Sequence, residues 1–170
     1  VWALVALHQA GQANPAYAAE LARKTQLLDL EGVAGVLTAF DPAPGSAPVV
    51  ASLSQALTEG LVTRLFQGRE VYGGLQERRP RRNGLILPDE TRTVAEVARA
   101  LARRDPRNAR LPLLTQALVT LGRDDGWGST NANASALLAL SELLEPKSLA
   151  GAASTGTATA MGNGGPMTIV

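Results

Sequence analysis

Hydrophobic residues recur along most of the chain at the spacing that places them on one face of an α-helix. Three segments follow the pattern, one with Val94, Val97, Ala98 and Leu101, one with Leu114, Ala117, Leu118 and Leu121, and one with Val50, Leu53, Leu57 and Leu61. Thr93 and Glu96 predict a capping box at the start of the first, and Gly122 predicts the end of the second. Further helices are expected at residues 15–27 and 31–40.

Two other segments, residues 1–9 and 134–144, are apolar on nearly every side, and Ser135, Ser141 and Glu142 alone are polar in the second. A helix without a polar face is stable where other helices surround it. Both are therefore predicted to be inner helices. The core side chains expected from them are Trp2, Leu4, Leu7, Leu137, Leu140 and Leu144.

The alternation of one-faced and all-apolar helices predicts an all-α fold for residues 1–145, with outer helices lying over inner ones. We expect part of an α/α toroid of antiparallel inner and outer helices. A superhelical repeat array of the HEAT kind is the structural alternative. WALVAL from Trp2 is similar to SALLAL from Ser135, which indicates a recurring helical unit.

Residues 146–170 differ from the rest of the chain because small residues and alternating patterns replace the helical spacing. An Asn-Gly turn at residues 162–166 separates two short alternating segments. This pattern predicts a linker followed by a β-like extension, the first strands of a β domain. A disordered tail is the alternative.

Composition limits the chemistry that the chain can perform. The 170 residues include one histidine and no cysteine, and the net charge is +1. Disulfides, thiolate nucleophiles and sulfur ligands for metals are therefore excluded, whereas the compartment is left open. The sequence starts inside a helical pattern without a methionine, so we expect a fragment of a larger protein. We expect no direct membrane insertion, because no apolar run is long enough to cross a bilayer.

Three sites could have either a chemical or a structural role. Trp127 between two glycines is either a binding platform or a packing plug, and the apolar helix that follows favours the plug. Asp124 and Asp125 could form an acid or metal pair, but adjacent acids before a glycine are more typical of a tight turn. His8, near the end of an apolar segment, is interpreted as a helix-end residue near a backbone carbonyl rather than a base or ligand.

A basic cluster lies in the middle of the chain, formed by Arg78, Arg79, Arg81 and Arg82, with Arg69 before it. Nucleic-acid binding would favour interleaved aromatic residues, and the cluster has none. Acidic residues lie nearby in the sequence, so a solvated loop or an inter-domain contact is expected instead. We assign no catalytic, cofactor-binding or metal-binding residue and no nucleic-acid partner.

DDGWGSTNANASALLALSELLEP at residues 124–146, preceded by LPLLTQALVTLGR from Leu111, resembles the end of the thioester-type helical domain of bacterial alpha-macroglobulins. WALVALHQAG from Trp2 is similar to another inner helix of that domain. The resemblance implies a non-catalytic module of a secreted or periplasmic endopeptidase inhibitor, with a lipid anchor as one means of attachment. Such a protein traps proteases after bait cleavage, and this module's partners would be those proteases and neighbouring β domains. The family's thioester cysteine has no counterpart here, so no thioester residue is transferred.

Two other classes stay open. The tryptophan–glycine turn is also similar to repeats of terpene cyclases and prenyltransferases. However, aromatic residues are few, no Asp-x-Asp-Asp run exists, and a zinc site of Asp, Cys and His lacks its cysteine. The other class is a helical-repeat scaffold for protein binding. In every case a truncated toroid exposes an apolar seam, so we expect self-association.

Overall fold

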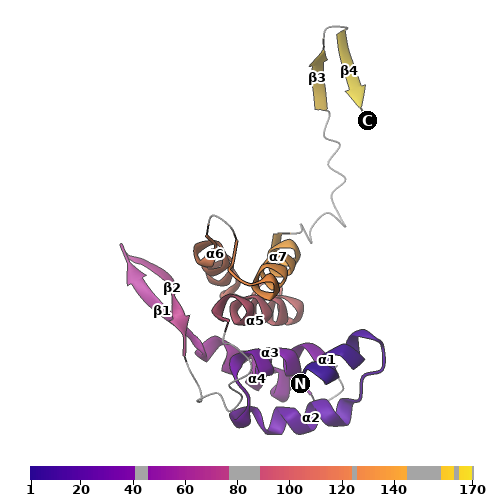
Figure 1. Cartoon of the computed structure of the whole chain (residues 1–170), viewed down its shortest axis with the longest axis vertical. Helices are drawn as coiled ribbons and strands as arrows, with labels where there is room; N and C mark the ends of the chain where they lie inside the picture. Colours follow the sequence, from indigo (N-terminus) through magenta and orange to yellow (C-terminus); the bar gives the residue numbers. More distant parts are fainter. Residues whose placement is uncertain (41–45, 77–88, 124–125, 145–157, 163–164, 170) are drawn as a thin grey trace.

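The computed structural model describes residues 1–40, 46–76, 89–123 and 126–144, together with the backbone of residues 158–162 and 165–169. This part of the chain is mainly helical (Figure 1). Its helices are α1 (Trp2–Gln9), α2 (Pro15–Arg23), the 3-10 turn η1 (Thr25–Leu27), α3 (Leu30–Ala39), α4 (Ala47–Glu59), α5 (Glu90–Arg104), α6 (Leu111–Leu121) and α7 (Thr130–Leu144). Its strands are β1 (Leu61–Phe66), β2 (Arg69–Leu75), β3 (Ala158–Gly162) and β4 (Gly165–Ile169).

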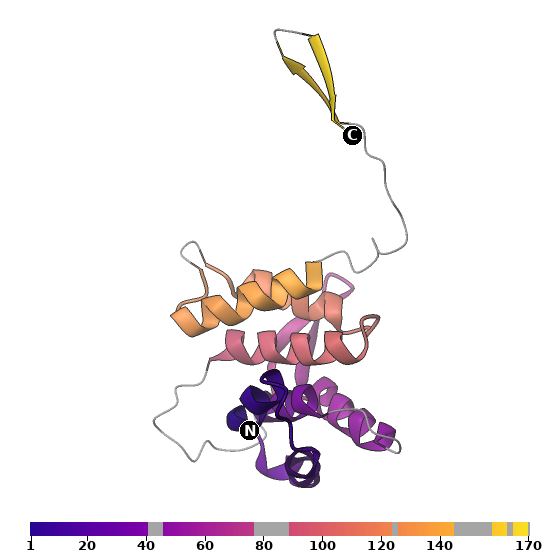
Figure 2. The ribbon, with the colours of Figure 1, turned by 90° about the vertical axis from the view of Figure 1, so that its right-hand side faces the viewer.

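The odd-numbered helices pack side by side in the order α1, α3, α5, α7. Cross-helix contacts fix their directions: Glu31 and Leu37 on α3 meet Arg92 and Arg104 on α5, so both helices run the same way. Glu96 and Arg103 on α5 meet Ser135 and Glu142 on α7 in the same order, so α5 and α7 also run the same way. Figure 1 and Figure 2 show from two sides how α3, α5 and α7 lie one above the other, with α6 beside α7.

The hydrophobic core lies around α3 and α5, which differs from the prediction that the inner helices are residues 1–9 and 134–144. In α3 every residue except Thr38 is buried. In α5, predicted as a one-faced outer helix, Val94, Val97 and Leu101 are buried together with all its alanines. The arginines of α5 misled the prediction, because most of them lie in ion pairs with neighbouring helices rather than in free solvent.

The predicted core of α1 and α7 is wrong in large part. Leu4 is buried and Leu140 is partly buried against the main core, as expected. The exposed fractions of the others are 45% for Trp2, 41% for Leu7, 59% for Leu137 and 68% for Leu144. The buried positions of α7 are instead the small residues Ala132, Ala136 and Ala139. Alanines let α7 lie close against α5, and a helix packed mainly against one neighbour leaves its opposite face open.

The predicted helix boundaries are correct for α1, α3 and the end of α6 and differ elsewhere. Residues 15–27 divide at Lys24 into α2 and η1, and α7 begins at Thr130 rather than at residue 134. Asp89, not Thr93, caps α5, because its Oδ1 accepts a 3.0 Å hydrogen bond from the backbone N–H of Arg92. Thr93 lies within the helix, so the predicted capping box is wrong. Leu61 does not continue α4, which ends at Glu59, but begins β1. Gly122 ends α6 as predicted.

A β-hairpin between α4 and α5 was not predicted. Strands β1 and β2 pair antiparallel, with Phe66 opposite Arg69, and Gln67 and Gly68 turn at φ values of 49° and 75°. Positive φ at both turn positions is the geometry of a tight two-residue hairpin. Two contacts fix β2 to the helices: Arg110, the residue before α6, pairs with Glu70 at 2.7 Å, and the Tyr72 hydroxyl donates to Glu90 of α5 at 2.7 Å.

The two short segments predicted as strands near the C-terminus do pair as the antiparallel strands β3 and β4. Residues 163–164, which hold the predicted Asn-Gly turn, lie outside the described residues, as do residues 145–157. Membership of the strands in a larger β domain stays a prediction.

Candidate interaction surface

The helices α1 and α7 both expose apolar side chains, and Trp2 of α1 and Leu138 of α7 line the same cleft. On α1 the exposed side chains are those of Trp2, Ala3, Ala6 and Leu7. On α7 they are those of Ala134, Leu137, Leu138, Ser141 and Leu144, beside Thr130 and Asn131 at the start of the helix. We name this set the open face. Contiguous exposed apolar surface on a folded chain is typical of a binding surface.

Two adjoining clefts lie along the open face. One, of about 380 Å³, lies between Trp2 of α1 and Leu138 of α7, with Glu96 of α5 also lining it. The other, of about 290 Å³, lies between α1 and α3 and also includes Trp2 and Glu96. Trp2 therefore stands where the clefts meet. Their walls combine apolar side chains of α1 and α7 with polar groups, and the charged ones all come from α5.

Arg92 connects three helices at one end of these clefts. Its Nε donates to Oε1 of Glu31 on α3 at 2.8 Å, and its Nη2 also contacts that oxygen. Its guanidinium carbon lies 5.8 Å from the centroid of the Trp2 ring, within the range of a cation–π contact. Burial raises the pKa of the Glu31 carboxyl, although the hydrogen bonds from Arg92 act in the opposite direction. The guanidinium of Arg92 thus contacts both the Glu31 carboxylate and the face of the exposed Trp2 indole.

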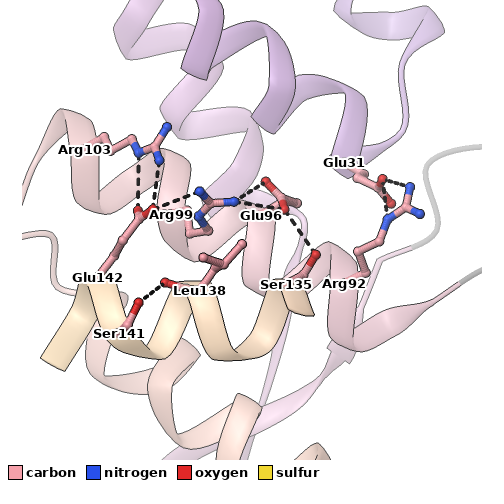
Figure 3. Close-up of polar contacts among 9 residues, drawn as sticks. All are labelled: Glu31, Arg92, Glu96, Arg99, Arg103, Ser135, Leu138, Ser141 and Glu142. Atoms are coloured by element: carbon pink, nitrogen blue, oxygen red, sulfur yellow. Dashed lines mark hydrogen bonds and ion pairs between the residues drawn. The ribbon is translucent and has the colours of Figure 1, made fainter. Parts of the chain in front are cut away.

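A second group of charges joins α5 to α7, drawn in Figure 3. Nη2 of Arg99 and Nη2 of Arg103 both lie 2.8 Å from Oε1 of Glu142. Arg99 also pairs with Glu96 at 3.3 Å, and the Ser135 hydroxyl donates to Glu96 at 3.4 Å. Burial alone would raise the pKa of Glu142, but hydrogen bonds from the two arginines hold that pKa below its ordinary value.

None of the residues that form the open face is charged, although charged side chains of α5 line the clefts beside it. Glu142 is the single charged residue of α7, and its carboxylate accepts hydrogen bonds from Arg99 and Arg103 of α5. On α1, His8 is the one titratable side chain. A surface with leucines, a tryptophan and no net charge favours contact with another apolar protein surface over contact with an ionic ligand.

The structure bears out the interpretation of Trp127 as a packing plug. Its side chain is half-buried, packs against the main core, and donates from Nε1 to the backbone carbonyl of Leu118 at 2.7 Å. The flanking glycines have φ values of +114° at Gly126 and +87° at Gly128, as expected for a glycine-braced turn. Trp127 therefore closes the connection between α6 and α7.

Among the other residues weighed for chemistry, the structure describes His8 and Arg69. His8 lies in the last turn of α1, as predicted, and is half-buried. Arg69 is exposed in β2. Asp124, Asp125 and the cluster of Arg78, Arg79, Arg81 and Arg82 lie outside the described residues. Sequence reasoning missed the pairs Glu31–Arg92 and Arg99–Glu142, since their partners are far apart in the sequence, although the Glu96–Arg99 spacing was visible.

Comparisons with protein-family models, with curated proteins and with solved structures find no match for this chain. Among the described residues, no helix has both the length and the apolar content needed to cross a membrane.

Proposed function

We propose that the chain is a non-catalytic helical module that works by protein–protein contact through its open face. The observation that carries the proposal is the exposure of Trp2, Leu137 and Leu138 on a face whose own residues are uncharged, beside a well-packed core. Covering such a surface lowers the free energy by roughly 25 cal/mol per Å² of apolar area removed from water. The ion pairs Arg92–Glu31 and Arg99–Glu142 join α5 to α3 and to α7 and so support the helices around this face.

We further propose that the module belongs to an alpha-macroglobulin-like endopeptidase inhibitor, as part of an α/α toroid. The packing of α1, α3, α5 and α7 side by side in that order is compatible with one layer of a two-layered toroid, and α1 and α7 coincide with two segments that carry the sequence resemblance. Within this proposal the protein is periplasmic or secreted, and the module packs against other domains while the inhibitor rearranges around a protease. A repeat scaffold can show the same packing, so the inhibitor class depends on a functional test.

The test uses the protein encoded by the complete reading frame. It is incubated with trypsin, and peptidase activity is measured on a small peptide and on a large protein substrate. Trapping retains cleavage of the peptide and suppresses cleavage of the protein, because a cage excludes large substrates. Equal loss of both activities, or no loss of either, would contradict an inhibitor that works by caging.

A further inference from the structure

The residues of α7 on the open face alternate between small and large along one line. The small ones are Ala134 and Ser141, and the large ones are Leu137 and Leu144. These residues repeat at the three- and four-residue steps of a coiled-coil seam. All four are exposed, so this seam is open to a partner along most of the helix.

We propose that the partner that fits the open face is a second copy of this chain, bound antiparallel through α7. A two-fold axis at the level of Ala139 places Leu144 of one copy opposite Ala134 of the other, and Leu137 opposite Ser141. Each leucine then meets a small residue, so large and small side chains interdigitate in both halves of the contact. The seam is self-complementary, as an isologous dimer interface requires.

Charge favours the same partner. A second copy brings an identical surface, so any charge on the seam would be present twice in the contact. Glu142 is the one charged residue of α7, and Arg99 and Arg103 hold it against α5, away from the seam. Two copies can therefore approach without repulsion and without burying an unpaired charge.

The area that a stable dimer must bury determines how much of the open face takes part. The 15 residues of α7 span about 22 Å, and one such helix pair buries less than the roughly 800 Å² per partner of a standard interface. Trp2 lies beside Leu138 in the same cleft, at the flank of the seam. The antiparallel arrangement brings the second copy's α7 alongside this flank, so α1 adds the missing area. We expect a reversible dimer with a Kd in the range of about 1 to 100 µM.

This inference rests on the proposed function only in taking the open face as an interaction surface. Sedimentation equilibrium of the 170-residue chain from 1 to 200 µM measures it directly. We expect a monomer–dimer equilibrium that Leu137→Arg weakens at least tenfold, whereas Val119→Arg on α6, another exposed apolar position, leaves the Kd within twofold. Circular dichroism checks that both variants keep the helical content of the wild type.

Cysteine cross-linking tests the register, because the chain has no cysteine of its own. A mixture of Leu137→Cys and Ser141→Cys chains should oxidise to a disulfide-linked dimer. A mixture of Thr130→Cys and Ser141→Cys chains should not, since the proposed register offsets these two positions by about two helical turns. A chain that stays monomeric at 200 µM, a Kd unchanged by Leu137→Arg, or equal cross-linking in both mixtures would overturn the dimer. If the chain is monomeric and the trypsin assay still shows caging, the dimer fails and the proposed function stands.

Discussion

The indole Nε1 of Trp127 donates a 2.7 Å hydrogen bond to the backbone carbonyl oxygen of Leu118, in the last turn of α6. The backbone N–H of Trp127 donates to Oδ1 of Asn133, in the first turns of α7, also at 2.7 Å. One residue therefore joins the end of one helix to the beginning of the next, and its ring fills the space between them. The position of α7, and with it the open face, depends on this connection.

Replacing Trp127 tests its structural role. Trp127→Ala removes the packing and the indole hydrogen bond, so we expect a loss of about 3 kcal/mol in the free energy of unfolding. Trp127→Phe keeps an aromatic ring but no donor, and we expect a loss of about 1 to 2 kcal/mol. Urea denaturation followed by circular dichroism measures both. A cost below about 1 kcal/mol for the alanine variant would show that the side chain is not a plug.

Gly126 is expected to resist substitution more than other glycines with positive φ. Its φ is +114°, and a Cβ there would clash with the side chain of Asn133. Gly126→Ala should therefore cost roughly 2 to 3 kcal/mol, from backbone strain together with the displaced Asn133. Gly68, at φ +75°, has no atom within 4 Å of such a Cβ, so Gly68→Ala should cost only about 1 kcal/mol. Equal destabilisation of the two variants in urea would argue against the clash.

Much of the helical pattern could be predicted from local residues, because apolar spacing and caps act within one helix. The boundaries of α3 and α6 and the glycine turn around Trp127 follow from such signals. The hairpin of β1 and β2 was missed because Leu61 extends the helical spacing of α4. Its turn, Gln67-Gly68, is a weaker signal than Asn-Gly.

The layer to which each helix belongs could not be predicted, because burial depends on neighbours that are distant in the sequence. The arginines of α5 looked like a solvated face, yet Arg99 has an exposed side-chain fraction of only 15% and is paired with Glu142 of α7. The leucines of α7 looked like core, yet its alanines form the close contact and Leu137 points outward. Residue type alone does not distinguish these outcomes.

Arg104 links the two halves of the helical body. Its guanidinium donates to the backbone carbonyl of Leu37 at 2.7 Å and to that of Phe40, where α3 ends. Hydrogen bonds from a charged donor contribute about 1.5 to 3 kcal/mol each when their loss strands an acceptor. Arg104→Met keeps the apolar stem, and we expect the free energy of unfolding to fall by roughly 2 to 3 kcal/mol.

The control for Arg104 is Arg23→Met. The side chain of Arg23 is 76% exposed and pairs with Glu20 on the surface of α2. Exposed pairs of this kind contribute little, so we expect a change below about 0.5 kcal/mol. Thermal melts of the two variants, recorded side by side, should separate clearly. Similar melting temperatures would mean that the carbonyls at the end of α3 find other donors.

The Glu142 pairs should make the attachment of α7 sensitive to acid. Because Arg99 and Arg103 lower the pKa of Glu142 in the folded state, the carboxylate stabilises the fold above its unfolded pKa, near 4.5, and this contribution disappears as the pH falls through the lower folded pKa. Glu142→Gln should therefore be roughly 1 to 2 kcal/mol less stable than the wild type at pH 7, and the difference should shrink toward pH 3.

Glu20→Gln serves as the matched variant for this pH series. The pKa of Glu20 is also lowered, mainly by the hydrogen bond from Lys24, but its side chain is 48% exposed on the surface of α2. Solvent screening should leave the stability difference between Glu20→Gln and the wild type small at every pH. Urea denaturation at pH 3, 5 and 7 gives both differences. If the stability deficit of Glu142→Gln stayed constant over that pH range, the ion pairs of Glu142 with α5 would not be the source of the stabilisation.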